Sequence, residues 1–295
     1  MGANWAKDYQ PVVYEWFRQG AASIPSMIPT LFAMPPSRRL TESSIGVGGI
    51  GIDVWDEYRK TGKTGHADLS RGYPKTFTHE EYTARFALKK KYIENDELGI
   101  VQETLFQMGL SAAQKKETDA ASVFNNSFTA GLGPDGVVLC SASHPVSPDD
   151  TSTLRDNVGA DAFSYSALKS ARQAMRAWTD AEDKPLQANG TLALLPIELA
   201  DVAIEIINAT NKPGGADNDA NAVQGFQHRT WDYLTDAESW WLIDPIRAKQ
   251  FLKWYDRVPL MNMIVEETTT DVVYEFRMMY SFGWTHWSFV FGNLA

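Results

Sequence analysis

The chain has 295 residues, of which 44% are hydrophobic and 12% aromatic, so it can bury a large core and is not globally disordered. Lys and Arg number 27 against 37 Asp and Glu, a net charge of −10, which disfavours direct readout of nucleic acid. One cysteine cannot form an intrachain disulfide, and neither a membrane span nor a signal-peptide pattern is visible, so we expect a cytoplasmic setting.

Residues 1–45 are expected to form an arm. The segment PVVYEWF predicts one short helix with Pro11 at its first position. The apolar segment that follows is broken by Pro25, Pro29, Pro35 and Pro36. Such a segment packs either on its own domain or on a neighbouring subunit, and both readings stay open. If the neighbour is the partner, deletion of residues 1–40 leaves a folded chain that fails to assemble.

Residues 46–92 are predicted to form a long hairpin. GVGGIGIDVWDEYR is strand-like at its start, KTGKTGHADLSRGYP is rich in turn residues, and KTFTHEEYTARFALKKKYI returns as a strand. The polar tip gains little by packing inward, so we expect it to project from the body.

The strongest helix signal covers about 94–128. Its apolar residues follow a 3,4 spacing over Leu98, Val101, Leu105, Met108 and Ala112. Gly109 and the charged stretch KKETD lower the helix propensity in the middle of this segment, so the helix can kink or break there.

The remaining segments alternate between helix and strand. VVLCS is expected to be a short strand and SHPVSPDD a loop. SYSALKSARQAMRAWTD predicts a helix, TLALLP a buried strand, and PIELADVAIEIINAT a helix entered at Pro196. FQHRTWDYL, SWWLID and FLKWYD read as strands, and the end of the chain as two strands about a turn near Gly283. The inward-facing helix residues are predicted to be Leu168, Ala171, Met175, Trp178, Leu199, Val202, Ala203, Ile206 and Ile207. The fold class is therefore α+β.

The stretch DGVVLCSASHP contains the one cysteine, Cys140, and His144 four positions later. In an extended chain these two side chains share a face. A thiolate nucleophile also needs an orienting group and an oxyanion hole, and neither is identifiable here. We therefore interpret Cys140 as a small buried hydrophobe.

Other patterns also fail the requirements of known sites. His66, His79, His144, His228 and His286 show no i, i+4 pair, and the chain has no CxxC or HExxH motif. GVGGIG at 46–51 lacks the flanking strand and helix of a dinucleotide loop, and GGADNDAN at 214–221 lacks the calcium-loop register. The pairs Glu80/Glu81 and Glu266/Glu267 point to opposite faces of a strand. We predict no catalytic, cofactor-binding or metal residue, no cofactor and no enzyme activity.

The order of these pieces resembles the major capsid proteins of tailed bacteriophages, particularly the Mu-like major head subunit group. The segments that carry the resemblance are DGVVLCSASHP after the long helix, the helix–strand–helix unit from LKSARQ to INAT, the stretch from PGGADNDANAVQG to WWLIDP, and the ending FRMMYSFGWTHWSFVFGN, similar to the family's terminal hairpin. The resemblance covers residues 75–295 well and residues 1–75 by architecture only.

The resemblance implies a domain plan: an N-terminal arm over 1–45, an extended loop over 46–80 that reaches over a neighbour, a peripheral domain formed by 81–160 and 246–295, and an axial domain over 161–245. The helix at about 94–128 would be the spine of the peripheral domain. Cys140 and His144 would lie in a structural connection between spine and axial domain.

The implied function is a subunit that self-assembles, as pentamers and hexamers, into the icosahedral shell around a double-stranded DNA genome. Implied partners are a separate scaffolding protein, a portal protein and decoration proteins, with no membrane, and the implied location is the virion after assembly in the host cytoplasm. Some relatives crosslink a loop lysine to an asparagine, for which Lys60, Lys63 and Asn293 are candidates without a specific signal. The alternatives are an encapsulin-type compartment, which shares the fold, and a soluble enzyme with an unrecognised site.

Overall fold

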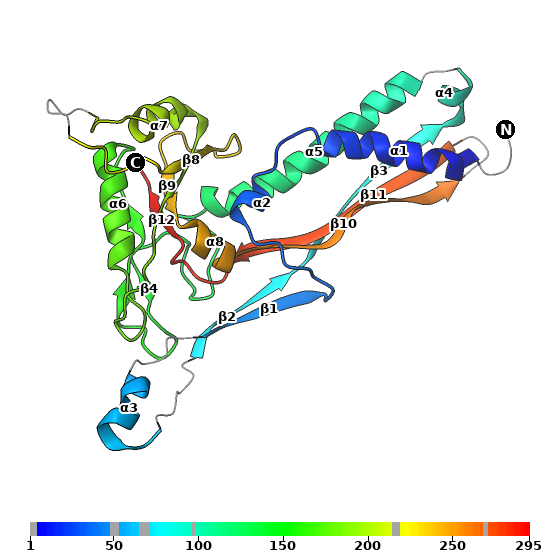
Figure 1. Ribbon diagram of the computed structural model, residues 1–295. Coiled ribbons are helices and arrows are strands. Elements are labelled where there is room, and N and C mark those ends of the chain that lie inside the picture. Colours follow the sequence, from blue (N-terminus) through cyan, green and yellow to red (C-terminus); the bar gives the residue numbers. More distant parts are fainter. Residues whose placement is uncertain (1–4, 48–52, 65–70, 96–97, 214–218, 268–270) are drawn as a thin grey trace.

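The chain folds into a long lobe, a compact lobe and a hairpin that projects from the region where the two lobes meet (Figure 1). The computed structural model describes residues 5–47, 53–64, 71–95, 98–213, 219–267 and 271–295. The statements below concern these residues.

A three-stranded antiparallel sheet forms the base of the long lobe, in the order β10 (Leu252–Glu267), β11 (Asp271–Trp284), β3 (Glu80–Lys89). Strand β11 lies in the centre and buries every second residue. Because successive strand side chains point to opposite faces, one face of β11 is apolar and accepts the helices. The buried residues on that strand include Val272, Tyr274, Phe276, Met278 and Tyr280.

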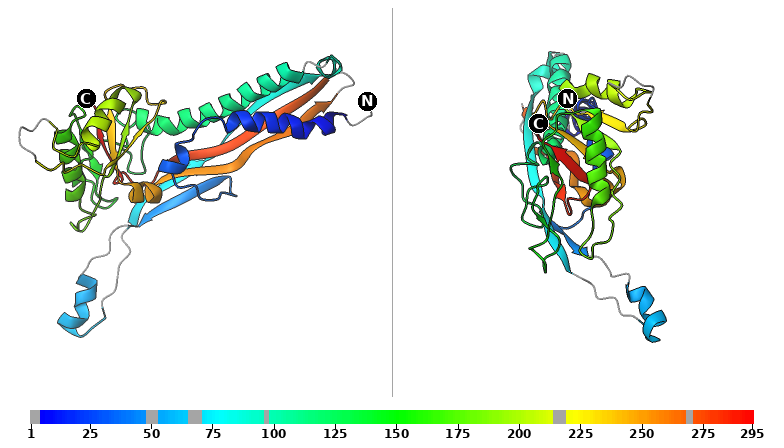
Figure 2. Two further views of the ribbon diagram at one scale, coloured as in Figure 1. Left: turned by 45° about the horizontal axis from the view of Figure 1, so that its top comes forward. Right: turned by 90° about the vertical axis from the view of Figure 1, so that its left-hand side faces the viewer.

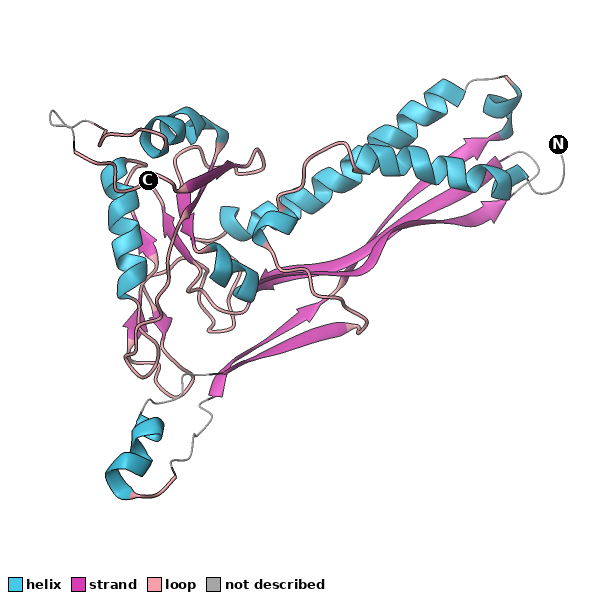
Figure 3. Ribbon diagram, viewed as in Figure 1, coloured by secondary structure: helices cyan, strands magenta, loops and turns pink. Residues whose placement is uncertain are grey.

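Two long helices, α5 and α1, run along this sheet (Figure 3). Helix α5 (Leu98–Asn125) is the predicted long helix and continues without a break through Gly109 and KKETD. The short helix α4 (Lys90–Glu94) precedes it as a separate element. Helix α1 (Trp5–Ala21) is longer than the predicted one, so Pro11 lies in the second turn and not at the first position. There the proline lacks the N–H that would bond the carbonyl of Lys7.

Helices α1 and α5 cross at two glycines. A Cβ atom added to Gly109 would lie 1.9 Å from the carbonyl oxygen of Phe17, and one added to Gly20 would lie 1.9 Å from that of Phe106. The backbones therefore approach each other more closely than any side chain allows. The crossing requires a glycine at position 109, although glycine has a low intrinsic helix propensity.

The N-terminal arm packs on its own chain. Phe17 stacks on Phe276 with ring centroids 4.0 Å apart, and Val13 lies beside it in the core of the long lobe. Ile28 and Leu31 of helix α2 (Ile28–Leu31), together with Phe32, are buried in the core that extends into the compact lobe. Of the two readings, packing of the arm on a neighbouring subunit is therefore wrong for these apolar residues, because they are buried against apolar residues of their own chain.

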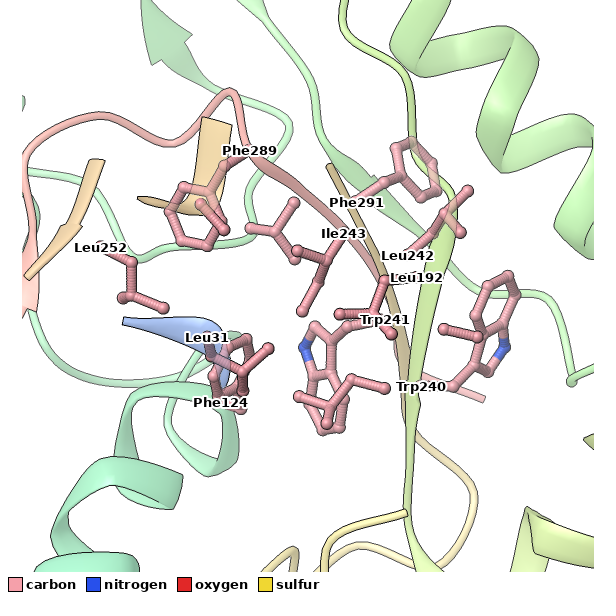
Figure 4. Close-up of a cluster of buried hydrophobic side chains, with 14 of the residues drawn as sticks. Leu31, Phe124, Leu192, Trp240, Trp241, Leu242, Ile243, Leu252, Phe289 and Phe291 are labelled. Carbon is pink, nitrogen blue, oxygen red and sulfur yellow. The ribbon is translucent and has the colours of Figure 1, made fainter. Parts of the chain in front are cut away.

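The compact lobe is built on a five-stranded mixed sheet. Its strand order is β6 (Val158–Gly159), β12 (Val290–Asn293), β9 (Trp240–Ile243), β7 (Leu192–Leu195), β8 (Gln227–Thr230). Strands β7, β9 and β12 are buried along their whole length. Trp241, Leu242 and Phe291 from these strands gather with Phe124 from α5 and Leu31 from the arm (Figure 4). One apolar core thus joins the compact lobe to the spine and to the arm.

Helix α6 (Tyr165–Ala177) faces this core as predicted, since Leu168, Ala171, Met175 and the following Trp178 are all buried. The next predicted helix begins as a single 3₁₀ turn at Ile197–Leu199, directly after Pro196, and continues as α7 (Ala200–Ile207).

The predicted inward face of that helix is only partly confirmed. Ala203, Ile206 and Ile207 are buried, whereas Val202 is 38% exposed and Leu199 half-buried. Val202 lies at the edge of the predicted apolar face, and Leu199 belongs to the 3₁₀ turn before α7, so both are less buried than Ala203, Ile206 and Ile207.

One predicted strand is wrong: VVLCS is irregular chain, fixed by side-chain hydrogen bonds to Val137, Leu139 and Ser141. The predicted strand FLKWYD is confirmed from Leu252, where β10 starts, whereas Phe251 is the last residue of helix α8 (Pro245–Phe251). Asp244 caps α8 by accepting from the backbone N–H groups of Ile246 and Arg247, and Pro245 follows at the first helical position. IDVWDEYR forms helix α3, described below.

The terminal hairpin does not exist as a paired unit. Strand β11 pairs with β10 and β3 in the long lobe, whereas β12 pairs with β9 and β6 in the compact lobe. The chain turns after Gly283, whose φ of +145° disfavours other residues, and it passes from one lobe to the other before β12. Two strands that are adjacent in sequence thus serve different sheets.

The projecting hairpin, as we name β1, β2 and α3 together, leaves the body near the lobe junction (Figure 2). Strands β1 (Thr41–Val47) and β2 (Arg71–Thr78) pair antiparallel. Helix α3 (Asp53–Thr61), which was not predicted, lies beyond them within the predicted hairpin. Ion pairs from Asp56 to Arg59 and Lys60, at 3.3 and 3.9 Å, support this helix at i, i+3 and i, i+4 spacing. The predicted glycine loop 46–51 lies mostly outside the described residues.

We expect Gly109→Ala to lower the free energy of unfolding by about 1–3 kcal/mol, because the new methyl group overlaps the Phe17 carbonyl. Gly99→Ala in the same helix is the matched control, since its Cβ meets nothing within 4 Å, and it should stabilise by about 0.5 kcal/mol. Urea unfolding of both variants measures this. Equal effects of the two substitutions would contradict the close crossing.

We also expect deletion of residues 1–40 to destroy the fold of the single chain. Each of the five buried arm residues contributes about 1.5–3 kcal/mol, and their sum approaches the whole stability of a typical domain. Circular dichroism and thermal melting test this. Leu40→Ser, at a side chain that is 72% exposed, is the control and should leave the melting temperature unchanged. A truncated chain that melts like the full chain would show that the arm is not part of the core.

Candidate assembly surfaces

Cys140 and His144 have separate partners and separate roles. Cys140 is 3% exposed, and its backbone N–H donates to Ser127 at 2.8 Å. Its sulfur lies so close to Gly292 of β12 that a Cβ there would be 2.6 Å away. Burial raises the pKa of the thiol to about 12. The thiolate form that nucleophilic chemistry needs is therefore disfavoured.

His144 is fully buried and stacks on Trp287 at 4.9 Å. Its Nδ1 lies 2.6 Å from Asp135 and its Nε2 lies 3.1 Å from Oδ1 of Asn157. Both partner atoms are acceptors, because the amide nitrogen of Asn157 donates to two backbone carbonyls. The ring is therefore held between two acceptors, Asp135 and Asn157. This arrangement fixes the segment 135–144 onto β12 and is structural.

The other sequence candidates are scattered. His79 lies between the hydroxyls of Ser37 and Ser281, at 2.9 Å from each, and burial lowers its pKa. His286 stacks on Trp287, and burial lowers its pKa to about 4. His228 is a half-buried residue of the edge strand β8. His66 lies outside the described residues.

The acidic candidates are also separated. Glu80 accepts from Tyr82, whereas Glu81 pairs with Arg277 of β11, so the two carboxylates have different partners. Nothing is described of the side chains of Glu266 and Glu267. Only residues 219–221 of the acidic glycine loop are described, and there the Asn221 amide donates to the carbonyls of Ile206 and Ala209.

Across the described ranges, no group of three or more His, Cys, Asp or Glu residues is arranged to hold a metal ion. None of the helices described here is long and apolar enough to cross a membrane.

Asn293, a crosslink candidate, is 1% exposed inside the compact lobe. Its Oδ1 accepts from the backbone N–H of Asp161 at 3.3 Å. Lys60 and Lys63 lie at the far end of the projecting hairpin, and the fold does not bring them to Asn293 (Figure 1). A lysine of another copy would have to open the compact lobe to reach this asparagine, so the arrangement disfavours a crosslink.

Sequence reasoning missed Glu117, which is 2% exposed in the middle of α5. Its carboxylate accepts from the hydroxyl of Ser26 at 2.6 Å, the backbone N–H of Met27 at 3.2 Å and the indole N–H of Trp231 at 3.0 Å. The sequence analysis treated the stretch KKETD, which contains Glu117, only as a weak point of the helix. The sequence does contain a signal for the burial of Glu117, namely its position. Glu117 precedes Ala120, Ala121 and Phe124 at i+3, i+4 and i+7, so it lies on the buried stripe of the helix.

Two exposed surfaces have no partner within the described chain. The first is α3 at the end of the projecting hairpin, where Tyr58 is 69% exposed. The second is the outer face of the 3₁₀ turn and α7, where Ile197 is 57% and Ile204 47% exposed. On the second surface Ile197, Val202 and Ile204 are exposed together, and a group of exposed apolar side chains on one element is typical of protein–protein contacts. On α3 the exposed aromatic side chain is that of Tyr58 alone among the described residues. Together with the rigid body between them, these two surfaces are suited to lateral contacts.

Comparison with known proteins identifies the family. A family model described as "Phage capsid protein" matches residues 72–293. A comparison with curated proteins found no significant match.

Solved structures extend the likeness to the fold. The capsid of bacteriophage JBD30 has a TM-score of 0.57 at 14% identity, covering 80% of this chain and 99% of the other. The mature capsid of bacteriophage PhiM1 has a TM-score of 0.57 at 11% identity, with 92% and 87% coverage. A virus-like particle from Pyrococcus furiosus has a TM-score of 0.55 at 7% identity, with 97% and 100% coverage.

These comparisons define the class of protein: a shell subunit with the α+β fold of phage capsids. The chain belongs to the phage capsid protein family, since the match spans about three quarters of its length. It is a structural protein of the phage virion and not an enzyme, as the sequence predicted.

We expect Cys140 to resist a thiol reagent at pH 8 in the folded chain. A pKa of about 12 leaves on the order of 1 in 10,000 of the thiols ionised, and burial blocks access as well. The urea-unfolded chain should react fully. Leu132→Cys, at a side chain that is 62% exposed, is the control and should add one fast-reacting thiol to the folded chain. Rapid labelling of native Cys140 would contradict its structural role.

Proposed function

We propose that the chain is the major capsid protein that self-assembles into the icosahedral shell around the double-stranded DNA genome of a tailed bacteriophage. The observation that carries this proposal is the projecting hairpin. It holds α3 away from both lobes (Figure 2), with Tyr58 exposed and with no carboxylate or cation of the body in contact with it among the described residues. A segment of this kind gains stability from a second copy of the chain.

The domain plan is part of this proposal. Residues 46–80 act as the extended loop, 81–160 with 246–295 as the peripheral domain around the spine α5, and 161–245 as the axial domain around the symmetry axes. The lobes support the plan in part: the long lobe holds α5 and the compact lobe holds α6 and α7, whereas β6 and β12, which the plan gives to the peripheral domain, belong to the sheet of the compact lobe. Residues 1–40 act within the subunit, as a brace along the spine, and β1 of the projecting hairpin begins at Thr41.

Pentamers and hexamers are the proposed assemblies, because a closed shell needs the same subunit in both settings. A separate scaffolding protein, a portal protein and decoration proteins are the proposed partners, with assembly in the host cytoplasm. The net charge of −10 suits a container for DNA, because a strongly basic lining would hold the phosphates by counterion release.

An encapsulin-type compartment is the second candidate. The likeness to the virus-like particle from Pyrococcus furiosus, at 7% identity over 97% of the chain, shows the shared fold alone and does not favour it. The family match over residues 72–293 favours the phage capsid. A co-purified cargo enzyme in small uniform shells would support the compartment instead.

Electron microscopy of the purified chain, alone and with co-expressed scaffolding protein, should show regular hollow particles. The matched variant replaces residues 48–70 by Asn-Gly, which joins the paired residues Val47 and Arg71 by a two-residue turn. This variant should keep the melting temperature of the full chain and form no particles. A full chain that stays monomeric in every condition contradicts the proposal, and a variant that assembles normally contradicts the role of the hairpin.

A further inference from the structure

Residues 285–289 carry the chain from the long lobe to the compact lobe, and we call this segment the crossover. It follows Trp284, the last residue of β11, and precedes Val290, the first residue of β12. Because β11 and β12 belong to different sheets, the conformation of the crossover affects how the two lobes are joined.

Helix α8 holds both ends of the crossover. The backbone N–H of Thr285 donates to the carbonyl of Phe251, the last residue of α8, at 3.0 Å. The backbone N–H of Asp244, the cap of α8, donates to the carbonyl of Phe289 at 2.9 Å. The crossover thus lies along α8, and its middle needs an attachment of its own.

His286 provides that attachment through one ring nitrogen. Its Nδ1 accepts from the backbone N–H of Ser288 at 3.1 Å and lies 2.8 Å from the hydroxyl of the same serine. Arg247 of α8 donates to that hydroxyl at 3.0 Å. The imidazole also packs on Phe251 and stacks on Trp287, with ring centroids 5.2 and 5.4 Å apart. His286 therefore closes the middle of the crossover onto α8.

These contacts determine which nitrogen of His286 carries the proton. A backbone N–H can only donate, so Nδ1 must be the acceptor and the proton must lie on Nε2. Nε2 has no protein partner among the described residues, and the ring lines a cavity of about 540 Å³. The neutral imidazole is therefore the form that fits the crossover.

A proton on Nδ1 is incompatible with this arrangement. The hydroxyl of Ser288 can rotate and accept from the protonated ring, but its backbone N–H cannot accept. Ser288 is fully buried, so its N–H would be left without an acceptor and without water. A buried donor without a partner is costly, and protonation therefore favours a form in which the crossover has opened.

The surroundings of His286 also oppose a charge on the ring. Burial lowers the pKa of His286 to about 4. Of the charged groups that face the ring, Asp135 raises this pKa, whereas His144 and Arg247 lower it. Asp135 is already bonded to His144, at 2.6 Å. The other charged side chains of the cavity wall are Arg155, Asp180 and Lys253.

We propose that His286 is an acid-sensitive clasp on the crossover: the neutral ring holds the segment against α8, and a proton taken up at Nδ1 releases it. The proton comes from solvent in the cavity, and β11 and β12 keep their own pairing partners. The lobes are then joined firmly at neutral pH and loosely in acid. This inference goes beyond the shell function proposed above and does not depend on it.

The direction of the pH effect follows from the two forms of the clasp. A histidine free of these contacts has a pKa of about 6.5, against about 4 in the closed clasp. Between these values the open form binds more protons than the closed form, so the closed form is destabilised as the pH falls. The opening equilibrium should rise about tenfold per pH unit between roughly pH 6 and pH 4, and it should be constant above about pH 7.

Hydrogen exchange of the full chain tests the clasp at the amide that bonds Nδ1. The protection factor of Ser288, corrected for the intrinsic exchange rate at each pH, should fall about tenfold per pH unit below about pH 6. Leu194, in the buried strand β7, is the internal reference and should keep its protection. Constant protection of Ser288 down to about pH 4.5 would overturn the clasp. A parallel loss at both amides would overturn it as well, because the whole chain would then be unfolding.

His286→Asn is the informative variant, because its Oδ1 takes the place of Nδ1 as an acceptor and does not titrate. Its Ser288 protection should be independent of pH. His228→Asn, on the edge strand β8, removes a histidine elsewhere and should leave the slope of the unmodified chain unchanged. The slope of the unmodified chain in His286→Asn would contradict the clasp.

A measurement on the unmodified chain serves if His286→Asn does not fold. Nuclear magnetic resonance of ¹⁵N-labelled histidine side chains gives the pH at which His286 takes up its proton in the folded chain. The fall in Ser288 protection should level off at that pH, because both forms are then protonated. Levelling at a different pH would assign the opening to another group and overturn the clasp.

Discussion

The carboxylate of Glu117 holds three parts of the molecule at one point. It lies in the middle of the spine α5, and it accepts hydrogen bonds from the arm at Ser26 and Met27 and from the compact lobe at Trp231. A buried carboxylate is tolerated only where donors satisfy it, so all three elements must be in place together. The relative position of arm, spine and compact lobe follows from this requirement and from the shared apolar core around Phe124.

The glycine crossing of α1 and α5, about two turns from Glu117 along α5, also fixes the arm on the spine. Gly20 and Gly109 let the two backbones meet, and Phe17 then reaches Phe276 across the sheet. The arm is thereby an integral brace. In a shell, lateral forces between copies act on this lobe. The brace holds the long helices on the sheet, so that they do not slide apart under these forces.

The projecting hairpin has the opposite character. Among the described residues, strands β1 and β2 pair with each other alone, although Tyr73 and Phe77 of β2 contact the body. Helix α3 is stabilised by local ion pairs and not by a core. Such local stability is marginal, so α3 depends on contacts outside the chain. The rigid body and the projecting α3 together give a subunit of fixed shape with one adjustable contact. Closed shells need this combination, since their subunits occupy slightly different settings.

The sequence by itself determined the α+β class, the long helix, the buried strand LALL, the inward face of α6 and the absence of catalytic motifs, because these depend on periodicity and residue chemistry within short windows. The collinear order of segments also carried the family resemblance that the match over 72–293 confirmed. Only the tertiary structure decided that the arm folds onto its own spine, that Glu117 is buried, and that β11 and β12 serve different sheets. Each of those outcomes depends on contacts between residues more than 50 positions apart, such as Ser26 with Glu117 and Asn293 with Trp240, or on the choice of pairing partner. No local pattern records such contacts.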